Sequence, residues 1–560
     1  MKKIWLYPLI AVIVLTVYIL PLGGRPLLTP DETRYAEIPR EMIENGNYIS
    51  PRLNGVRYFE KTPFSYWAFA VSFKIFGMNR FSLRLPCMLA MLATAWIVYM
   101  LAGHYYEDRR MCLLAAMIFA AMPYVYVLAV TAITDMFLTL FVTAASVTFF
   151  LAAQDDVPWK RRLGLLILCG IGCALAFLTK GFLAFAVPAV TLVPYLIWDR
   201  KWKKIFTLIW IPLVVMVLVA APWCIAIHHQ EPDFWRYFIF VEHINRFFGG
   251  EKAQHANNFF YFFPVMVGAI ALWLLMLPNL WKAWRSQFRD SPLLKFCSCG
   301  VVLPFLLFSC SSGKLATYIL PCMPPAAILI AMGLRQFFVE ERRTKAFHLT
   351  LLVFSAAMPL AFIASIANIL TKFPEVFFMK EDWRQLVLLA AAMLMTLVGF
   401  YLAWKAVDRY AKLFLLQIAL FPLLTASNFI FPAAMKEWKA PSEFLAEVYR
   451  HPDLPKENVI FVNNRRSFQD VCLMFRTTQV RMLGKRNEIE YGLSYPEEKH
   501  RFLPNYDALE ALYWDQKKKK GHLVIVTQDS FLNDFKRLLP EPVRIWRTHP
   551  GLDGYAVLLY

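Results

Sequence analysis

Long apolar runs recur along the first 432 residues of the chain, separated by shorter polar stretches. A helix needs about 20 apolar residues to cross the hydrocarbon core of a bilayer. Thirteen runs approach this length, at residues 4–21, 82–103, 111–131, 134–153, 163–179, 182–198, 205–226, 260–281, 292–310, 319–338, 349–368, 385–404 and 411–432. The pattern therefore predicts a polytopic α-helical membrane domain over residues 1–432 with thirteen transmembrane helices.

Lysine and arginine residues concentrate in every second loop between these runs. The basic loops contain Lys2 and Lys3, Arg109 and Arg110, and residues 160–162, 200–204, 282–289, 342–345 and 405–412. Cytoplasmic loops carry the excess of positive charge, so these loops are predicted to face the cytoplasm. The other loops, beginning with residues 22–81, are then predicted to face outward, and an odd number of spans puts the C-terminus on the outer side.

The pattern changes after Pro432, where the chain becomes polar. Apolar runs at 459–462, 523–527 and 555–559 are short and bounded by polar residues, which is typical of buried strands. Helical patterns near 441–450, 507–515 and 529–538 alternate with them. We therefore predict that residues 433–560 form a small soluble α/β domain on the outer side.

Composition agrees with a membrane protein. Hydrophobic residues make up 58% of the chain and charged residues 18%, whereas a soluble domain has about 45–50% and about 25%. The net charge of +19 is explained by the basic loops. The chain has no zinc-finger spacing and no glycine-rich nucleotide motif, so no nucleic-acid partner is expected.

The first outer loop contains an unusual density of polar side chains between Thr29 and Pro63. Thr29 to Glu32 reads as a helix start, with Thr29 as N-cap and Glu32 as the capping-box partner. Asp31, Arg34 and Tyr35 then share one helix face. Asp31 is the candidate catalytic acid, and the alternative is a purely structural role in the first turn. Tyr35, Tyr58 and Glu60 of the same loop are candidate substrate-binding residues.

Three ionisable residues stand at the outward ends of predicted spans: Asp135, Lys180 and Lys314. Charges at a membrane boundary are functional candidates because their desolvation is costly. We predict a catalytic role for Asp135 and substrate binding for Lys180 and Lys314. The alternatives are a structural ion pair for Asp135 and extension of the lysines toward the interface.

A group of candidate phosphate-binding residues comes from several outer loops. Lys61 precedes an aromatic-rich helix predicted at 64–76, which is suited to lie flat at the interface. Tyr318 begins the tenth span, where unpaired backbone N–H groups can face an anion. Arg246 adds a guanidinium that can hold phosphate oxygens by two hydrogen bonds. Without a nucleotide motif, this set predicts a phosphate carried on a lipid.

Two further observations concern metals. Glu60 and His243 are a candidate pair for a divalent metal such as zinc, although the sequence offers no third ligand, and ordinary hydrogen bonding is the alternative. Asp31 and Glu32 are adjacent acids that could also hold a divalent ion. Our expectation is that no metal is required.

Seven blocks of residues, in order along nearly the whole chain, resemble the motifs of one enzyme class. They are residues 30–38, 57–61, 179–184, 231–235, 241–247, 313–320 and 491–496. The chain resembles the GT-C class of polyprenyl-dependent glycosyltransferases, and within it the lipid A 4-amino-4-deoxy-L-arabinose transferases.

The resemblance implies a GT-C fold and a reaction at the periplasmic face of the bacterial inner membrane. Aminoarabinose would pass from an undecaprenyl phosphate donor to a phosphate of lipid A, giving resistance to polymyxin and cationic antimicrobial peptides. Asp31 matches the acid of the family, and Lys61, Arg246 and Tyr318 match its contacts to the carrier phosphate. One departure is Thr62, which separates Lys61 from the proline that follows directly in the family pattern.

A phosphate acceptor is largely ionised near neutral pH, since its second pKa is about 6. A strong general base is therefore not obligatory, and Asp31 could orient the acceptor, stabilise positive charge on the sugar or bind its amine. We expect a single displacement with inversion. The alternatives are a related transferase acting on another sugar or on a protein acceptor, and a lipid transporter.

Overall fold

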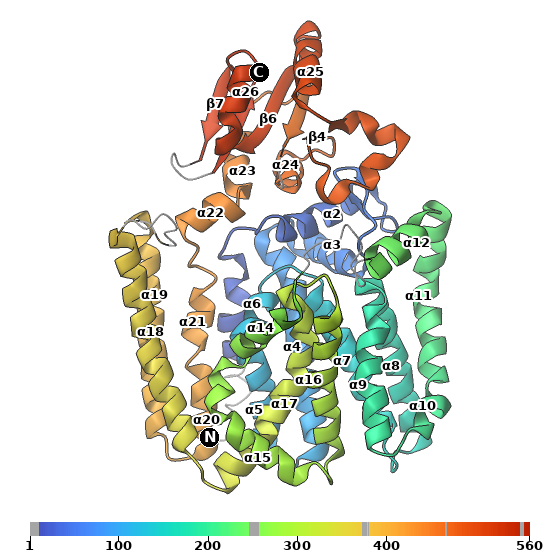
Figure 1. Ribbon diagram of the computed structural model, residues 1–560, viewed down its shortest axis with the longest axis vertical. Coiled ribbons are helices and arrows are strands. Elements are labelled where there is room, and N and C mark those ends of the chain that lie inside the picture. Colours follow the sequence, from blue (N-terminus) through green and yellow to red (C-terminus); the bar gives the residue numbers. More distant parts are fainter. Residues whose placement is uncertain (1–10, 246–256, 372–377, 379, 465–466, 549–553) are drawn as a thin grey trace.

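The computed structural model describes residues 11–245, 257–371, 378, 380–464, 467–548 and 554–560. A bundle of long helices forms one end of the molecule and a domain containing a β-sheet forms the other (Figure 1). Helices α2 (Asp31–Asn45) and α3 (Phe64–Phe76) lie between these two parts. This arrangement confirms the predicted fold class, a polytopic helical protein with a C-terminal α/β domain.

Every predicted span corresponds to a helix or a bent helix pair. Within the described residues, nine helical stretches are long and apolar enough to cross a membrane: Arg80–Tyr105, Asp135–Ala152, Trp159–Lys180, Lys203–Gln230, Pro292–Cys310, Ala316–Glu340, Lys345–Ala367, Lys380–Lys405 and Arg409–Ala426. Two further spans are bent pairs, Arg109–Ala121 with Pro123–Ala129 (64°) and Phe259–Ala269 with Ala271–Gln287 (80°). The remaining two predicted spans overlap the shorter helices Ala11–Gly23 and Leu183–Trp198. The total of thirteen spans stays a prediction.

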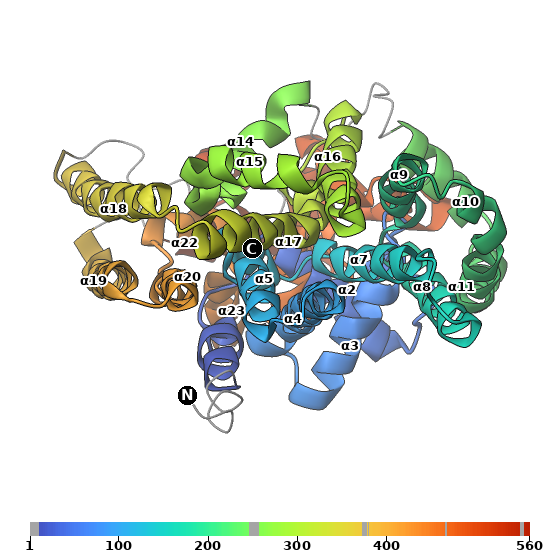
Figure 2. The same ribbon diagram turned by 90° about the horizontal axis from the view of Figure 1, so that it is seen from below.

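The helices differ in how much of their surface is covered. Helix α7 (Asp135–Ala152) lies in the middle of the bundle and packs against α8 (Trp159–Lys180) and α4 (Arg80–Tyr105). Helices α11 (Trp210–Gln230), α18 (Lys345–Thr371) and α19 (Trp383–Lys405) lie at its edges (Figure 2). Exposed apolar side chains cover the outer helices, as lipid contact requires. The central position of α7 places Asp135 inside the assembly.

The C-terminal domain contains a six-stranded sheet in the order β5-β4-β3-β6-β8-β7. Strands β3 (Val459–Asn463), β4 (Arg481–Leu483), β5 (Phe502–Leu503) and β6 (His522–Gln528) are parallel, and β7 (Arg544–Arg547) and β8 (Tyr555–Leu559) complete the sheet with antiparallel pairing. The three apolar strands predicted from the sequence are β3, β6 and β8. The other three were not predicted because they are short or contain exposed arginines.

Helices accompany this sheet, and one of them reaches the membrane domain. Helices α23 (Ser442–Arg450), α25 (Tyr506–Lys518) and α26 (Leu532–Leu538) correspond to the three predicted helical patterns. Helix α24 (Phe468–Phe475) was not predicted, and it packs against α2. The α2–α24 contact therefore joins the C-terminal domain to the first loop.

The start of α2 differs from the predicted capping box. The helix begins at Asp31, with Pro30 as N-cap and no side-chain cap. The Thr29 hydroxyl donates instead to the buried Asp470 carboxylate of α24, over 2.8 Å. Glu32 is fully buried and pairs with two arginines. The capping prediction was wrong because both side chains have partners from distant segments.

Candidate functional site

A polar cavity of about 1090 Å³ lies where the helical bundle meets the C-terminal domain. Seven of the side chains predicted from the sequence line it: Asp31 and Tyr35 of α2, Glu60 and Lys61 of the next loop, Asp135 of α7, Lys180 of α8, and Tyr318 of η7 (Ala316–Cys322). These residues come from five segments that are far apart in the sequence. The tertiary fold is therefore what brings them together.

The start of α2 presents an accessible acid to the polar cavity. Arg34 Nη2 donates to Asp31 Oδ1 over 2.6 Å, and Arg34 Nη1 forms an ion pair with Glu488 of the C-terminal domain. The Asp31 side chain is 58% exposed, whereas that of Arg34 is 14% exposed. Asp31, Arg34 and Tyr35 all line the cavity, as their shared helix face predicts. Arg34 holds the Asp31 carboxylate while leaving it open to a ligand.

Asp135 and Lys180 form a second charged pair on the wall of the cavity. Lys180 Nζ lies 2.7 Å from Asp135 Oδ1, and each side chain is only 10% exposed. The same ammonium lies 4.7 Å from the centroid of the Tyr318 ring. The ion pair that was the structural alternative for Asp135 is therefore present, and it stands inside the candidate site.

A second cavity, of about 480 Å³, adjoins the polar cavity. The two share four lining residues, Glu60, Lys61, Lys180 and Tyr318. The rest of the second cavity is mostly apolar, with Phe182, Leu183, Ala186, Ile239, Leu307 and Phe308 among its walls. A site of this kind suits a ligand with a polar head, an apolar tail and a charge at the junction.

The junction between the two cavities carries both signs of charge. Lys61 Nζ donates to the Glu60 carbonyl over 2.8 Å and lies 3.4 Å from a carboxylate oxygen of Glu242. Burial and the nearby Glu242 charge raise the pKa of Glu60 to about 7, although Lys61 opposes this. Tyr58 is buried outside the cavity walls and donates to Glu60 Oε2 over 2.7 Å. Tyr58 therefore positions Glu60.

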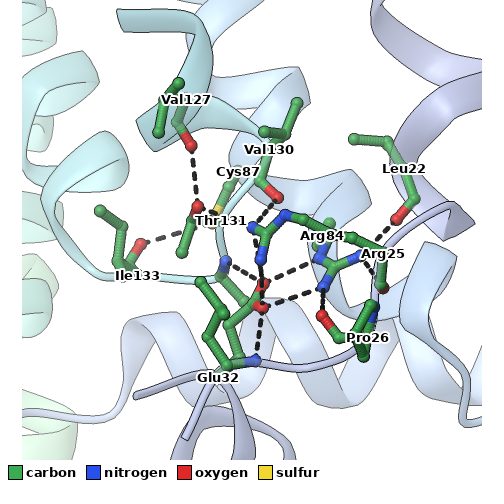
Figure 3. Close-up of polar contacts among 12 residues, drawn as sticks. Leu22, Arg25, Pro26, Glu32, Arg84, Cys87, Val127, Val130, Thr131 and Ile133 are labelled. Carbon is green, nitrogen blue, oxygen red and sulfur yellow. Dashed lines mark hydrogen bonds and ion pairs between the residues drawn. The ribbon is translucent and has the colours of Figure 1, made fainter. Parts of the chain in front are cut away.

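A buried network fixes the start of α2 against the bundle (Figure 3). The Glu32 carboxylate accepts from Arg25 Nη1 over 3.0 Å and from Arg84 Nε and Nη2 over 2.8 and 2.9 Å. It also accepts from the backbone N–H groups of Leu28 and Ala132, over 3.0 and 3.1 Å. Burial would raise the pKa of Glu32, but the two arginines outweigh it and lower that pKa to about 2.

The arginines extend this network to backbone carbonyls. Arg84 donates to those of Leu22, Arg25 and Pro26, over 2.8 to 2.9 Å. Arg25 donates to the carbonyl of Val130 over 2.9 Å. Residues 130–132 lead directly into α7, so the network fixes Asp31 relative to Asp135. Sequence reasoning had assigned Glu32 to the helix cap and missed this role.

Two of the predicted substrate-binding residues, Lys314 and Tyr318, are placed differently from the prediction. Lys314 does not line the polar cavity; its ammonium donates to the backbone carbonyls of Asn257 and Ser311. The Tyr318 N–H donates to the Leu315 carbonyl over 3.0 Å, so Tyr318 contributes its ring rather than an unpaired N–H. The Lys314 ammonium therefore joins its own turn, through Ser311, to the distant segment that contains Asn257.

The candidate metal pair and Arg246 remain predictions. His243 Nδ1 lies 2.7 Å from the Phe238 carbonyl, and the Phe182 N–H points to Nε2 over 3.4 Å. Among the residues that the structure describes, no three His, Cys, Asp or Glu side chains are grouped in a way that could hold a metal ion. Arg246 lies outside the described residues.

The sequence did not reveal the part of the cavity wall that comes from the C-terminal domain. Lys439, Gln469, residues 484–488 and Glu490 line the polar cavity opposite the membrane helices. Their only signal in the sequence is a polar loop after a short strand. The pairing of Arg34 with Glu488 depends on the docking of two domains, which periodicity does not report.

Comparison with known proteins shows the family to which this chain belongs. A dolichyl-phosphate-mannose-protein mannosyltransferase family model matches residues 3–238, and a model of the C-terminal domain of arabinosyl transferase ArnT matches residues 436–552. An undecaprenyl phosphate-α-4-amino-4-deoxy-L-arabinose arabinosyl transferase of Shewanella sediminis is 34% identical, over 97% of this chain and 96% of the relative. The chain belongs to this arabinosyl transferase family.

Other relatives agree with this membership of the arabinosyl transferase family. The enzyme of the same name from Erwinia tasmaniensis is also 34% identical, over 95% of each chain. The crystal structure of ArnT from Cupriavidus metallidurans bound to undecaprenyl phosphate has a TM-score of 0.83 at 23% identity, covering 100% of this chain and 98% of the other. The Archaeoglobus fulgidus oligosaccharyltransferase shares the fold more distantly, with a TM-score of 0.51 at 13% identity over 96% of this chain and 71% of the other. The chain is therefore a multi-pass membrane glycosyltransferase with the GT-C fold.

Proposed function

We propose that this protein transfers 4-amino-4-deoxy-L-arabinose from undecaprenyl phosphate to a phosphate of lipid A. The observation that carries the proposal is the shared wall of the two cavities. An apolar cavity can receive the isoprenoid chain, the polar cavity can receive the sugar and the acceptor, and Lys61 and Lys180 stand where the carrier phosphate would lie. The names of the relatives give the sugar and the carrier.

The proposed reaction is a single displacement at the anomeric carbon. An acceptor phosphate oxygen forms the new bond to that carbon, and the bond from the carbon to the carrier phosphate oxygen breaks. Undecaprenyl phosphate leaves with the bonding electron pair, and the cations at the junction stabilise its charge. Attack from the opposite face inverts the configuration.

Asp31 is the candidate catalytic residue in this scheme. Its exposed carboxylate can contact the sugar amine or stabilise the positive charge that develops on the ring, while Arg34 holds it in place. The acceptor phosphate is already ionised near neutral pH, so the step needs neither a strong base nor a metal to create the nucleophile. We therefore propose that transfer persists in the presence of EDTA.

We also propose that the cavities open to the periplasm at the inner membrane, and that the modification lowers the negative charge of lipid A and protects against polymyxin. The alternation of basic loops supports this orientation. Alkaline phosphatase fused after Tyr560 should be active. If the fusion is inactive in a correctly inserted protein, the C-terminal domain lies in the cytoplasm and the proposed orientation is wrong.

The variant Asp31→Asn tests the central residue. Loss of the charge should lower transfer by about a hundredfold or more, with unchanged expression. If Asp31 only stabilised the first turn of α2, neutralisation would cost about 0.3–1 kcal/mol and little activity. Asp507→Asn is the matched control, since Asp507 is an exposed acid in the first turn of α25, outside the cavity. Equal activity in both variants would leave only the structural role for Asp31.

A further inference from the structure

The C-terminal domain contributes a cationic wall to the polar cavity. This wall consists of Lys439, at the end of α22 (Ala433–Lys439), and of Lys485 and Arg486, which follow β4. In the described part of the chain, these three side chains form no ion pair, whereas Arg34 and Lys180 on the opposite side are paired with carboxylates. The cationic wall therefore has positive charge available for a ligand.

Neighbouring contacts place the Arg486 guanidinium and the backbones of Lys485 and Lys439, and the Lys439 ammonium lies 4.3 Å from the centroid of the Trp438 ring. The guanidinium carbon of Arg486 lies 4.4 Å from the centroid of the Phe502 ring, and Phe502 also lines the cavity. The backbone N–H of Lys485 donates to the Leu483 carbonyl over 2.9 Å. The carbonyl of Lys439 accepts from the Thr29 N–H over 2.8 Å, two residues before Asp31. Strand β4 and the α2 start thus hold the wall in place.

The cationic wall is also connected to the candidate catalytic acid. Glu488 follows Arg486 by two residues and pairs with Arg34, which in turn bonds to Asp31. Gln469 of α24 donates to Glu488 Oε1 over 3.2 Å and fixes it from the other side. A ligand on the cationic wall is therefore held within the cavity that contains Asp31.

The charge of this wall selects among the ligands of the reaction. The donor sugar carries an amine, which is a cation and is repelled by the wall. The carrier phosphate is bound to an isoprenoid, and none of the three cations lines the apolar cavity. An anionic acceptor group is what remains. An arginine with two lysines suits a phosphate, because the guanidinium can form two parallel hydrogen bonds to its oxygens.

We propose that Lys439, Lys485 and Arg486 form the binding site for the phosphate of the acceptor glycolipid. This inference rests on the proposed function and deepens it, since it assigns acceptor recognition to the C-terminal domain. Donor recognition then belongs to the membrane helices, and each substrate has its own wall of the polar cavity.

The experiment compares two triple variants of the full-length protein in detergent. One replaces Lys439, Lys485 and Arg486 with alanine. The control replaces Lys517, Lys518 and Arg537, which are equal in charge, exposed and outside the cavity. Each lost charge-assisted hydrogen bond should raise the KM for phosphorylated lipid A about tenfold. The KM for the donor should not change, which shows that the variant is folded. Salt should weaken acceptor binding to the unaltered protein more than to the cationic-wall variant.

A direct binding measurement separates this inference from the proposed function. Labelled lipid A is bound to the protein without donor, and dephosphorylated lipid A and phosphatidylglycerol are added as competitors. On the unaltered protein, phosphorylated lipid A should compete better than either of the other two lipids. On the cationic-wall variant it should compete only weakly. Equal binding to both triple variants would overturn the inference, and so would equal competition by phosphatidylglycerol, which would assign the wall to bulk anionic lipid. If acceptor binds through these residues but no transfer occurs, the proposed function fails and the inference stands.

Discussion

Glu32→Gln tests whether the buried network holds the site together. The Glu32 side chain is completely buried, and its carboxylate accepts from Arg25, Arg84 and two backbone N–H groups. Lowering of its pKa from 4.5 to about 2 means that the folded protein favours the charged form by about 3 kcal/mol. Removal of one partner from a buried ion pair costs about 3–5 kcal/mol. The two values agree, so we expect a loss of about 3 kcal/mol in stability.

The pH dependence of this loss has a defined sign. The folded pKa of Glu32 lies below its unfolded value, so its stabilisation is fully present above pH 4.5 and is lost as the pH falls toward 2. Glu32→Gln should therefore be clearly less stable than the unaltered protein at pH 7, with the difference shrinking in acid. Thermal unfolding of both proteins in detergent, without added donor, measures this difference in stability.

Glu44→Gln is a suitable control for the Glu32 variant. Glu44 also pairs with a buried arginine, Arg40, but the Glu44 side chain is 51% exposed and Arg40 keeps Glu37 as a second partner. Neutralisation of Glu44 should therefore cost only about 0–1 kcal/mol. Glu32→Gln should lower the unfolding temperature far more than Glu44→Gln does, and it should lower kcat because Asp31 and Asp135 lose their fixed separation. Equal unfolding temperatures for the two variants at pH 7 would refute the reasoning.

Three further predictions concern individual charged residues. Lys61→Ala and Arg246→Ala should each reduce the rate of transfer about ten- to a hundredfold. The rate loss in the double variant should be smaller than the product of the two single losses, because both residues would bind one phosphate. Full activity of either single variant in a transfer assay would place the carrier phosphate elsewhere. Asp135→Asn and Lys180→Met should each destabilise the protein more than the double variant does, because a single change leaves one buried charge unpaired; additive losses in thermal unfolding would contradict this. Burial raises the pKa of Asp470 to about 6, so its folded pKa lies above its unfolded value. Asp470→Asn should therefore increase the stability of the protein at pH 8 but not at pH 4. An equal change in stability at both pH values would show that the charge of Asp470 is not the cause.

The membrane fold could be predicted from the sequence because its dominant signal is local. Each apolar run indicates a helix or a bent pair of helices. The positions of Asp135 and Lys180 at the ends of such runs also indicate that both stand at one membrane boundary. The same holds for Asp31, Arg34 and Tyr35, since their spacing on a helix determines a shared face. The structure places all five of these side chains on the wall of the polar cavity, and their roles in the reaction stay predictions.

What could not be predicted depends on contacts between distant segments. Glu32 and Thr29 fit a capping box by spacing, but Arg84 and Asp470 compete for them in the folded protein. Lys314 has the same boundary position as Lys180, yet nearby carbonyls bind its ammonium. The cationic wall is formed by docking of the C-terminal domain, and nothing in the hydrophobic pattern reports how two domains meet.

The most direct test of the proposed transfer is mass spectrometry of lipid A. Cells that lack this gene but make the undecaprenyl-linked donor should be compared with the same cells carrying the unaltered gene or the Asp31→Asn variant. Our account predicts that lipid A gains the mass of one aminopentose on a phosphate only with the unaltered gene. Unmodified lipid A in all three strains, or an added sugar of another mass, would contradict it.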